Sequence, residues 1–338
     1  MSTHAPPPAA TMMKIVTAYW LSQAVGVVAK LGVADLLSGG PRDAKDLAQE
    51  TQTNPDALHR VLRCCASVGI FSMHSDRRFG LTALGETLCS GSAGSLRDFA
   101  IAETAPGHWL PWGKLESAVR AGSPSTHEAL GSDIFGFYAT HPHEAGPFTR
   151  AMGNLSAMVS GEVARVIDLS QAEIIVDVGG ANGVLLAATL AANPKAHGVL
   201  FDLPHVVADA KTYLASRGLQ GRTETLGGDF FAEVPPGDAL LLKAVLHDWD
   251  NAKALSILRG CRAALRSGGR LVVVEMLLPE DNAPSMAQLM DLNMLVMLTG
   301  RERSKAEFES LFQEAGLRLE RVHGTHSPFS VLEAMVQA

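Results

Sequence analysis

Blocks of apolar and polar positions alternate along the second half of the chain. Short apolar runs rich in valine, isoleucine and leucine predict strands, and apolar residues three or four positions apart predict helices. The elements expected there are strands 174–177, 199–202, 238–242 and 270–275, helices 251–266, 284–299 and 305–315, and an antiparallel hairpin of 319–322 with 329–336. Strands that alternate with helices predict an α/β fold with a doubly wound, mainly parallel sheet.

The first half of the chain shows the helical period instead, with one short exception. The expected elements are helices 14–38, 43–50 and 56–68, a cap at Asn54 and Pro55, a two-stranded wing at 71–81 and a helical bridge up to residue 170. Two helices followed by a wing are typical of a winged helix. This pattern raises a DNA-binding regulator as an alternative to an enzyme.

The charge of the predicted winged helix argues against DNA. Residues 40–90 contain six basic and six acidic residues, so this segment has no net charge. A DNA-binding face needs net positive charge to gain from counterion release. The whole chain has a net charge of -7, which also disfavours a nucleic-acid partner.

Length and composition agree with a globular protein of about two domains. The chain has 338 residues, of which 47% are hydrophobic, enough for a large core. Its four cysteines, Cys64, Cys65, Cys89 and Cys261, lack metal-ligand spacing and suit a reducing, cytoplasmic location. Residues 1–14 are rich in proline and alanine, so we expect a frayed tail and no signal peptide. No stretch is expected to reach transmembrane length.

Four charged residues follow apolar runs of the predicted sheet. They are Asp177, Asp202, Asp229 and Lys243. Ligands of an open parallel sheet bind beyond the carboxyl ends of its strands, so we expect these side chains to line a ligand site. Asp202 can accept hydrogen bonds from a ribose diol, and Asp229 with Phe230 can flank an adenine.

The glycine-rich loop after the first of these strands separates two kinds of nucleotide. The sequence Asp177-Val-Gly-Gly-Ala-Asn-Gly183 lacks the G-x-G-x-x-G spacing of a dinucleotide site, in which a helix start faces a pyrophosphate. It fits the D-x-G-x-x-x-G loop of class I S-adenosylmethionine methyltransferases, with Ala181 at a position that is often glycine. The loop therefore favours a nucleoside without a phosphate.

Five further motifs follow in order after this loop. They are Phe201-Asp-Leu-Pro-His205, Gly228-Asp-Phe230, His247-Asp-Trp-Asp250, Glu275-Met-Leu-Leu-Pro279 and Gly300-Arg-Glu-Arg-Ser304. Together with the loop, they resemble the small-molecule O-methyltransferase family that includes caffeate, hydroxyindole and bacterial polyketide O-methyltransferases. The resemblance covers essentially the whole chain.

The resemblance implies a fold, a cofactor and a partner. It implies a Rossmann-like, doubly wound sheet of seven strands preceded by a helical, winged-helix-like dimerisation domain. The implied divisions are residues 1–100 for dimerisation, 101–170 for a helical bridge lining the acceptor pocket, and 171–338 for the catalytic domain. S-adenosylmethionine is the implied methyl donor, S-adenosylhomocysteine its product, and a homodimer the implied assembly. We expect no metal, nucleic-acid or membrane partner.

The resemblance also assigns residues to roles. The implied catalytic residues are the base His247 and the flanking carboxylates Glu275 and Glu302. The implied cofactor contacts are Ser156, Asp177, Gly179, Gly180, Gly183, Asp202, Leu203, Gly228, Asp229, Phe230 and Lys243. The expected acceptor contacts are His108, Trp109, Met152, Asp248, Trp249, Asn293, Met294 and Met297, of which the methionines suit an adaptable apolar pocket.

The base is chemically reasonable only for certain acceptors. A phenol has a pKa of about 10 and a free imidazole about 6.5, so full proton transfer costs roughly 5 kcal/mol. A carboxylate on the second ring nitrogen, from Glu275 or Glu302, lowers this cost because it stabilises the imidazolium. Phenolic or enolic hydroxyls of aromatic or polyketide metabolites are therefore the expected acceptors, and the sequence leaves the individual molecule open. N-methylation, or non-methylating chemistry with the same cofactor, is the alternative within this fold.

Overall fold

The computed structural model describes residues 6–92 and 94–337. By internal contacts the chain divides into two compact units, each described by itself below: Met1–Trp109 with Tyr138–Leu155, and Leu110–Phe137 with Ser156–Ala338. Helix α11 (Pro142–Val166) contributes to both units. The domain boundaries near residues 100 and 170 stay a prediction.

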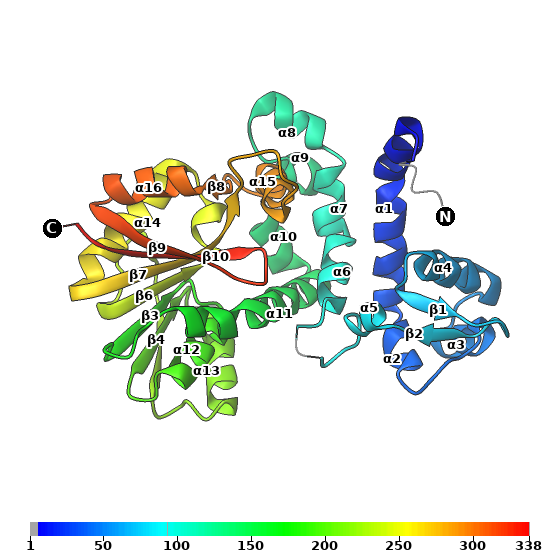
Figure 1. The fold of residues 1–338 in the computed structure, drawn as a ribbon, viewed down its shortest axis with the longest axis horizontal. Coiled ribbons are helices and arrows are strands. Elements are labelled where there is room, and N and C mark those ends of the chain that lie inside the picture. The colour runs from blue at the N-terminus through cyan, green and yellow to red at the C-terminus, as the bar shows by residue number, and fades with distance from the viewer. Residues whose placement is uncertain (1–5, 93, 338) are drawn as a thin grey trace. The chain divides into compact units, whose positions relative to one another are not determined.

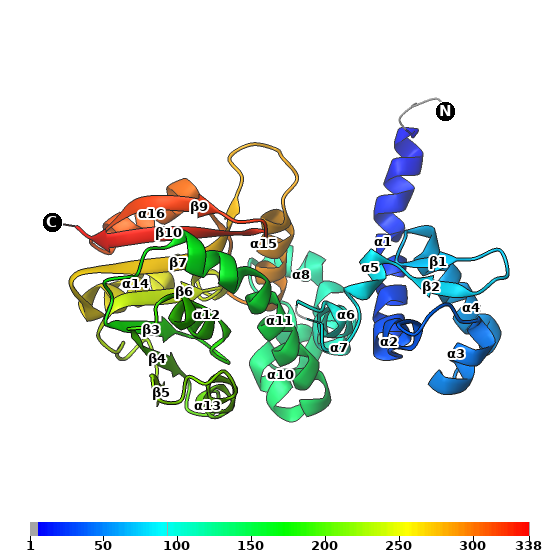
Figure 2. The same ribbon diagram turned by 60° about the horizontal axis from the view of Figure 1, so that its bottom comes forward.

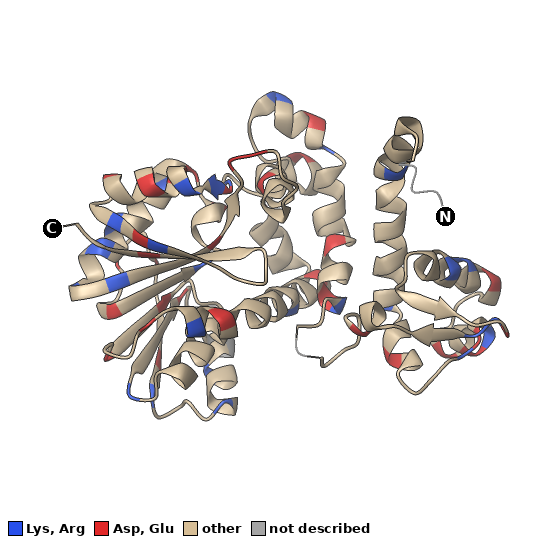
Figure 3. Cartoon of the chain, viewed as in Figure 1, with Lys and Arg blue, Asp and Glu red and all other residues tan. Residues whose placement is uncertain are grey.

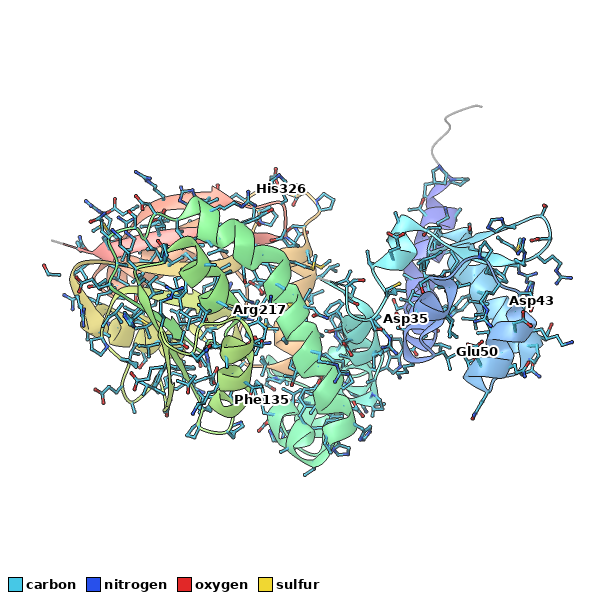
Figure 4. All side chains as sticks on the ribbon, turned by 90° about the horizontal axis from the view of Figure 1, so that it is seen from below. Asp35, Asp43, Glu50, Phe135, Arg217 and His326 are labelled. Atoms are coloured by element: carbon cyan, nitrogen blue, oxygen red, sulfur yellow. The ribbon has the colours of Figure 1, made fainter. Side chains whose placement is uncertain are left out.

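The first unit contains the predicted helix–helix–wing arrangement (Figure 1). Its elements begin with α1 (Pro8–Lys30), α2 (Val33–Leu37), α3 (Ala44–Thr51), α4 (Pro55–Ser67), β1 (Phe71–Met73), β2 (Phe79–Leu81), α5 (Ala83–Glu86) and α6 (Arg97–Glu103). Strands β1 and β2 pair antiparallel as the wing. Asp43, labelled in Figure 4, caps α3 by accepting the Asp46 N–H at 2.8 Å, and Asn54 caps α4 by accepting the Ala57 N–H at 3.0 Å. The predicted starts of these helices are thereby confirmed.

Helix α1 corrects two expectations. It begins at Pro8, so residues 8–14 are helical and form no frayed tail, while residues 1–5 lie outside the described residues. Proline suits the first turn of a helix, because its missing N–H would have no partner there. At 23 residues α1 is also long and apolar enough to cross a membrane, by length and composition only, which contradicts the expectation of no such stretch. One such helix near an N-terminus is a weak sign of a membrane segment, since a helix of a soluble protein passes the same test.

The second unit is built on a sheet whose main path has seven strands, in the order β5-β4-β3-β6-β7-β10-β9 (Figures 1 and 2). The strands are β3 (Ile174–Val178), β4 (His197–Asp202), β5 (Thr223–Gly227), β6 (Gly237–Lys243), β7 (Leu265–Leu278), β9 (Leu317–Gly324) and β10 (Phe329–Val336). Strands β5, β4, β3, β6 and β7 are parallel, and the β9–β10 hairpin adds two antiparallel strands at one edge. The predicted α/β fold and closing hairpin are confirmed.

Helices cover both faces of this sheet. Four short helices follow α6 in the chain: α7 (Pro106–Trp112), α8 (Leu115–Ala121), α9 (Thr126–Leu130) and α10 (Ile134–Thr140). The elements between and after the strands are α12 (Val184–Ala192), α13 (Val207–Ser216), η1 (Leu246–Asp248), α14 (Asn251–Ala264), α15 (Met286–Met297), β8 (Arg303–Ser304) and α16 (Lys305–Glu314). Neighbouring strand residues face different cores: Ile175 packs with α12 and α13, whereas Val176 packs with α14 and α16. Burial on both faces explains why these strands are continuous apolar runs rather than alternating ones.

The predicted helix 14–38 is two helices, α1 and α2, because Gly32 between them takes a left-handed φ of 66°. The boundary between α14 and β7 also differs from the sequence prediction. Helix α14 ends at Ala264, and β7 begins at Leu265, so residues 267–269 lie within the strand instead of forming a glycine-rich stop. The register between β6 and β7 shifts between Gly237 and Ala239, which accommodates the extra residues. The two-residue strand β8, paired parallel with β7, was not predicted because two residues carry no periodicity.

Candidate active site

His247 lies between carboxylates on the turn that follows β6. Its Nδ1 is 2.7 Å from Glu302 Oε1 and 3.8 Å from Glu275 Oε2, and its Nε2 is 3.4 Å from Asp248 Oδ1. The side chain of His247 is 12% exposed, whereas those of Glu275 and Glu302 are fully buried. The structure thus brings together the three predicted catalytic residues and Asp248.

The two glutamates do different things. Glu275 Oε1 accepts the backbone N–H groups of Val245 and Leu246, at 3.1 and 2.9 Å, and so anchors the start of the turn that carries His247. Glu302 is the hydrogen-bond partner of the imidazole itself. The second oxygens of both carboxylates are buried, and neither has a hydrogen-bond partner. Unsatisfied buried carboxylate oxygens are costly and are found where a protein does chemistry.

The contact with Glu302 determines which imidazole nitrogen can act as a base. A carboxylate accepts hydrogen bonds, so Nδ1 carries the proton and Nε2 remains the basic nitrogen. Burial acts to lower the pKa of His247, but the charges of Glu275 and Asp248 and the bond to Glu302 outweigh it and raise that pKa to about 10. Burial disfavours the charged form of a carboxyl group, and it therefore raises the pKa of Glu275 to about 7.

The same three residues could in principle hold a metal ion, because one ligand atom of each lies within 4.8 Å of the others. The 2.7 Å separation of Nδ1 and Glu302 Oε1 is that of a hydrogen bond. Two ligands of a tetrahedral zinc ion, each about 2.0 Å from it, would stand further apart. Glu275 Oε1 is already engaged by two N–H groups. This arrangement fits a hydrogen-bonded base better than a metal centre, and the expectation of no metal stays a prediction.

The glycine-rich loop after β3 leaves room for a ligand because it has almost no side chains. Gly179 and Gly183 have φ angles of 69° and 80°, which favour glycine. A Cβ at Gly180 would lie 2.7 Å from Asp177 Cγ, so this position also requires glycine. Ala181 takes a φ of 48°, a left-handed angle that is uncommon for alanine.

Asp202 holds that unusual residue in place. Its Oδ2 accepts the Ala181 N–H at 2.8 Å, and its Oδ1 accepts the Leu203 N–H at 2.7 Å. The end of β4 is therefore joined to the loop after β3, as expected for neighbouring parallel strands. Leu203 itself is 46% exposed beside this carboxylate.

Asp177 is buried and Lys243 is half-buried at the ends of the two central strands. Asp177 is 1% exposed, and burial raises its pKa to about 7 although Lys243 opposes the rise. Burial lowers the pKa of Lys243, which the charges of Glu275, Asp177 and Asp248 oppose. Lys243 Nζ also lies 5.3 Å from the centre of the Phe329 ring. Lys243 thus interacts electrostatically both with Asp177, at the start of the predicted cofactor loop, and with Glu275 and Asp248 beside His247.

Aromatic rings flank the end of β5. The Gly228 N–H donates to the Asp202 carbonyl at 2.9 Å, and Asp229 Oδ1 accepts the Phe231 N–H at 2.9 Å. The Phe230 ring stands edge-on to Trp249 with ring centres 6.3 Å apart. The predicted cofactor contacts of this unit, except Ser156 on α11, thus gather at the carboxyl ends of β3, β4, β5 and β6.

Helix α15 supplies the polar and apolar groups expected to contact an acceptor. Met294 and Met297 are buried, and Asn293 is half-buried rather than facing solvent freely. Trp112 Nε1 donates to Asn293 Oδ1 at 3.0 Å, a contact that joins residues 181 positions apart. The helix is also tied to the base, because Asp291 Oδ1 accepts the Glu302 N–H at 2.9 Å.

Three predicted acceptor contacts belong to the first unit. His108, Trp109 and Met152 lie there, and the structure does not bring them together with the His247 cluster within one unit. His108 is 4% exposed, stacks on Phe148 at 5.5 Å and contacts Tyr138 Oη at 3.1 Å. Burial lowers its pKa to about 4. Ser156 lies in the second unit, on α11, and its carbonyl accepts the Ser160 hydroxyl at 2.6 Å.

Sequence reasoning missed Arg303 and Asp291. Arg303 is 1% exposed in the second unit, although it lies inside the Gly300–Ser304 motif that had drawn attention only to Glu302. The available signal was a basic residue next to Glu302, the glutamate predicted to be catalytic.

Models of two protein families match the chain. Residues 112–318 match the O-methyltransferase domain, and residues 13–91 match the O-methyltransferase dimerisation domain. A phenazine O-methyltransferase of Lysobacter antibioticus is 38% identical over 97% of this chain and 96% of its own length. The mitomycin biosynthesis 6-O-methyltransferase of Streptomyces lavendulae is 39% identical over 92% and 89%. An N,N-dimethyltransferase for 8-amino-8-demethylriboflavin from Streptomyces davaonensis is 32% identical over 90% and 89%.

Solved structures with bound cofactor are also similar. A calicheamicin biosynthesis methyltransferase bound to S-adenosylhomocysteine has a TM-score of 0.88 and 34% identity, with 98% of each chain covered. A neocarzinostatin biosynthesis O-methyltransferase bound to S-adenosylmethionine and 2-hydroxy-5-methyl naphthoic acid has a TM-score of 0.78 and 32% identity, with 93% of this chain and 95% of that chain covered.

Proposed function

Because this chain belongs to the family of S-adenosylmethionine-dependent O-methyltransferases, we propose that it methylates a phenolic or enolic hydroxyl of a small aromatic metabolite, with His247 as the general base. The predicted family, the fold, the enzyme class and the methyl donor are confirmed. The observation that carries the proposal is the 2.7 Å contact between His247 Nδ1 and Glu302, which leaves Nε2 as a base at the strand ends.

The residues at the strand ends suit the methyl donor. The loop at 179–183 exposes backbone in place of side chains, Asp202 offers carboxylate oxygens for a ribose diol, and Phe230 offers an aromatic face for an adenine. When bound, S-adenosylmethionine supplies an electrophilic methyl group and a good leaving group. The task left to the protein is to align the acceptor and remove its proton.

The carboxylates around His247 change the energetics of the base. A free imidazole is a weaker base than a phenolate by about 3.5 pKa units. With its pKa raised to about 10, the imidazole of His247 matches a phenol, so that proton transfer between them costs little. Binding a phenol to neutral His247 and binding a phenolate to the imidazolium give the same complex. Both describe a proton shared near Nε2.

The pH dependence of catalysis tests this electrostatic picture. His247 must lose a proton before it can accept one, and its pKa is raised to about 10. The value of kcat/KM should therefore rise with pH from about 7 to 9, about tenfold per unit. In Glu302→Gln the rising limb should move to lower pH, because a charge that favours the imidazolium is gone. A rate profile that does not move in this variant would contradict the pairing of these residues.

The contact between Trp112 and Asn293 supports a proposal for how the acceptor is selected. An indole N–H only donates, so the Asn293 oxygen must face Trp112, and the amide N–H₂ remains as the donor for other partners. Asn293 Nδ2 is 3.8 Å from Met290 Sδ, a weak contact. We infer that Asn293 favours acceptors with a carbonyl, carboxylate or ring nitrogen beside the hydroxyl.

Replacing Trp112 by phenylalanine should raise KM for the acceptor by about 2- to 10-fold, the effect of losing one neutral hydrogen bond. The aromatic packing is kept, so affinity for S-adenosylmethionine should not change. Steady-state kinetics with the best hydroxylated naphthoate or phenazine, and calorimetry with the cofactor, measure the two quantities. An unchanged KM for the acceptor would contradict the proposal that Asn293 contacts the acceptor.

N-methylation is the second candidate, favoured by the relative that acts on an amino-riboflavin. An aromatic amine needs no base before it attacks a methyl group, whereas a phenol does. The buried His247–Glu302 pair therefore supports oxygen as the methylated atom. Turnover of 3-amino-4-hydroxybenzoate, which carries both groups on one ring, decides the question when the product is identified by NMR. Methylation at nitrogen alone would reject the hydroxyl proposal.

The first unit supports a homodimer. Helix α1 exposes Ile15, Val16, Tyr19 and Trp20 by 51–64%, and its sequence lies largely within the matched dimerisation domain. Figure 3 shows that α1 is nearly free of charged residues, while acidic and basic residues lie side by side on α3 and α4. This mixture also supports the earlier prediction that the winged helix does not bind nucleic acid. A cytoplasmic location and the lack of a membrane partner stay predictions.

A single charge on α1 should break the dimer. Val16→Glu should convert a dimer into a monomer in sedimentation experiments at micromolar concentration, because a carboxylate would be buried without a partner. Met73→Glu is the matched control, since Met73 is an exposed apolar residue of the same unit, on β1. Dissociation of both variants, or of neither, would reject α1 as the interface.

A further inference from the structure

The largest fully buried side chain of the described residues is a charged one, Arg303, with 1% exposure. Burying a guanidinium is costly unless its N–H groups find acceptors. No carboxylate forms an ion pair with Arg303 among the described residues. Its partners are instead three backbone carbonyls and one side-chain amide oxygen. Such an arrangement fixes backbone geometry rather than neutralising charge.

The four acceptors surround the catalytic turn. Arg303 Nη1 donates to the Leu246 carbonyl at 2.9 Å and, at 3.4 Å, to the Arg301 carbonyl. Its Nη2 donates to the Trp249 carbonyl at 2.8 Å, and its Nε to Asn251 Oδ1 at 3.0 Å. Residues 246, 249 and 251 bracket His247 on both sides. One planar group therefore fixes the chain before and after the base.

The same segment carries the partner of the base. Glu302 reaches His247 Nδ1 at 2.7 Å, and the neighbouring Arg301 N–H donates to the His247 carbonyl at 2.9 Å. A Cβ at Gly300 would overlap the His247 carbonyl oxygen, so the two segments are in direct backbone contact.

We propose that Arg303 is a positioning residue, which sets the distance between His247 and Glu302 by joining the turn at 246–251 to the segment at 300–304. The proposal rests on the proposed function, in which that pair forms the base. Arg303 acts through His247 and does not touch the reacting atoms. A displacement of about 1 Å in such a pair is enough to slow a reaction about 100-fold.

Lysine in place of Arg303 tests the proposal, because it keeps the charge but cannot reach four acceptors arranged around a plane. The first readout is the Nδ1 proton of His247 in protein labelled with ¹⁵N-histidine. Because the chain has 12 histidines, this signal is assigned to His247 by its absence from the spectrum of His247→Ala. A short charge-assisted bond gives a downfield, slowly exchanging proton. In Arg303→Lys this signal should be lost or should exchange at least tenfold faster.

Arg222→Lys is the matched control. Arg222 donates to four backbone carbonyls, those of Leu190, Asn193, Pro194 and Ala196, at 3.0–3.2 Å. It lies at the amino end of the edge strand β5, whereas His247 follows the carboxyl end of the central strand β6. This variant should lose stability yet keep the His247 signal. An unchanged signal in Arg303→Lys, or its equal loss in Arg222→Lys, would overturn the proposal.

Activity supplies the second readout and separates this proposal from the proposed function. With the best acceptor from a methyl-transfer screen, Arg303→Lys should lower kcat about 10- to 100-fold and leave cofactor affinity unchanged. In a His247→Ala background it should have no further effect. An additive loss would overturn positioning, whereas full activity of His247→Ala would reject the base and leave the NMR result standing.

A milder variant covers the case in which Arg303→Lys does not fold. Asn251→Ala removes only the acceptor of Arg303 Nε, from the exposed first residue of α14. The His247 Nδ1 proton should then exchange about two- to tenfold faster, as expected for the loss of one hydrogen bond. An exchange rate equal to that of the wild type would overturn the proposal.

Discussion

Replacing His247 by alanine should lower kcat by about 10²- to 10⁴-fold, the range for loss of a general base. The affinity for S-adenosylmethionine should stay within about twofold, because in the proposed function His247 contacts the acceptor and not the cofactor. The physical reason is the position of the ring: Nδ1 is bonded to Glu302 at 2.7 Å, so only Nε2 can take a proton. Steady-state kinetics with the best acceptor and calorimetry with the cofactor test the two statements.

A second histidine of the same unit provides the control for this experiment. His323 Nε2 lies 2.6 Å from Glu333 Oε1 on the β9–β10 hairpin, the same type of pair in a different place. His323→Ala should leave kcat near the wild-type value. If His247→Ala retains full activity, proton removal is no part of the slow step, and the acceptor must bind already ionised.

Replacing Asp202 by alanine should weaken S-adenosylmethionine binding about 10- to 100-fold, the cost of losing one charge-assisted hydrogen bond to the ribose. A second effect adds to this loss. Asp202 Oδ2 holds the Ala181 N–H at 2.8 Å, and Ala181 has a φ of 48° that it adopts at some cost. Without the carboxylate, the loop after β3 should relax from the geometry that admits the ligand.

Asp238→Ala is the matched control for the Asp202 variant. Asp238 Oδ2 accepts the N–H groups of Glu173 and Ile174 at 2.9 and 2.8 Å, but near the amino end of β6. Both variants should lower the melting temperature, and only Asp202→Ala should change the affinity measured by calorimetry. If Asp202→Ala and Asp238→Ala bind the cofactor with equal affinity, Asp202 does not contact the cofactor.

Several elements could be predicted because the signals are local. The cap at Asn54 and Pro55, the strand that contains Asp177 and the loop with Gly179 and Gly183 each depend on a few neighbouring residues. The errors have local causes too. Residues 8–14 lacked a clear helical pattern because proline and alanine leave no apolar stripe, yet proline fits a first helical turn.

The sequence by itself determined which residues reach the same edge of the sheet. The carboxyl ends of parallel strands meet there, so Asp177, Asp202 and Lys243 had to gather once the strand pattern was recognised. It also placed His247 just after Lys243, near that edge. The pattern of apolar positions is sufficient for this prediction, because it shows which face of each element is buried and where the element ends.

Only the tertiary structure decided which carboxylate is bonded to the base. The sequence left Glu275 and Glu302 as equal candidates, but Glu302 bonds Nδ1 while Glu275 holds backbone N–H groups. The sequence pattern also could not predict the hydrogen bond between Trp112 and Asn293. The same holds for the hydrogen bonds that Arg303 donates to the turn around His247. Hydrogen bonds form or fail over tenths of an ångström, and those distances depend on how segments far apart in the chain pack together.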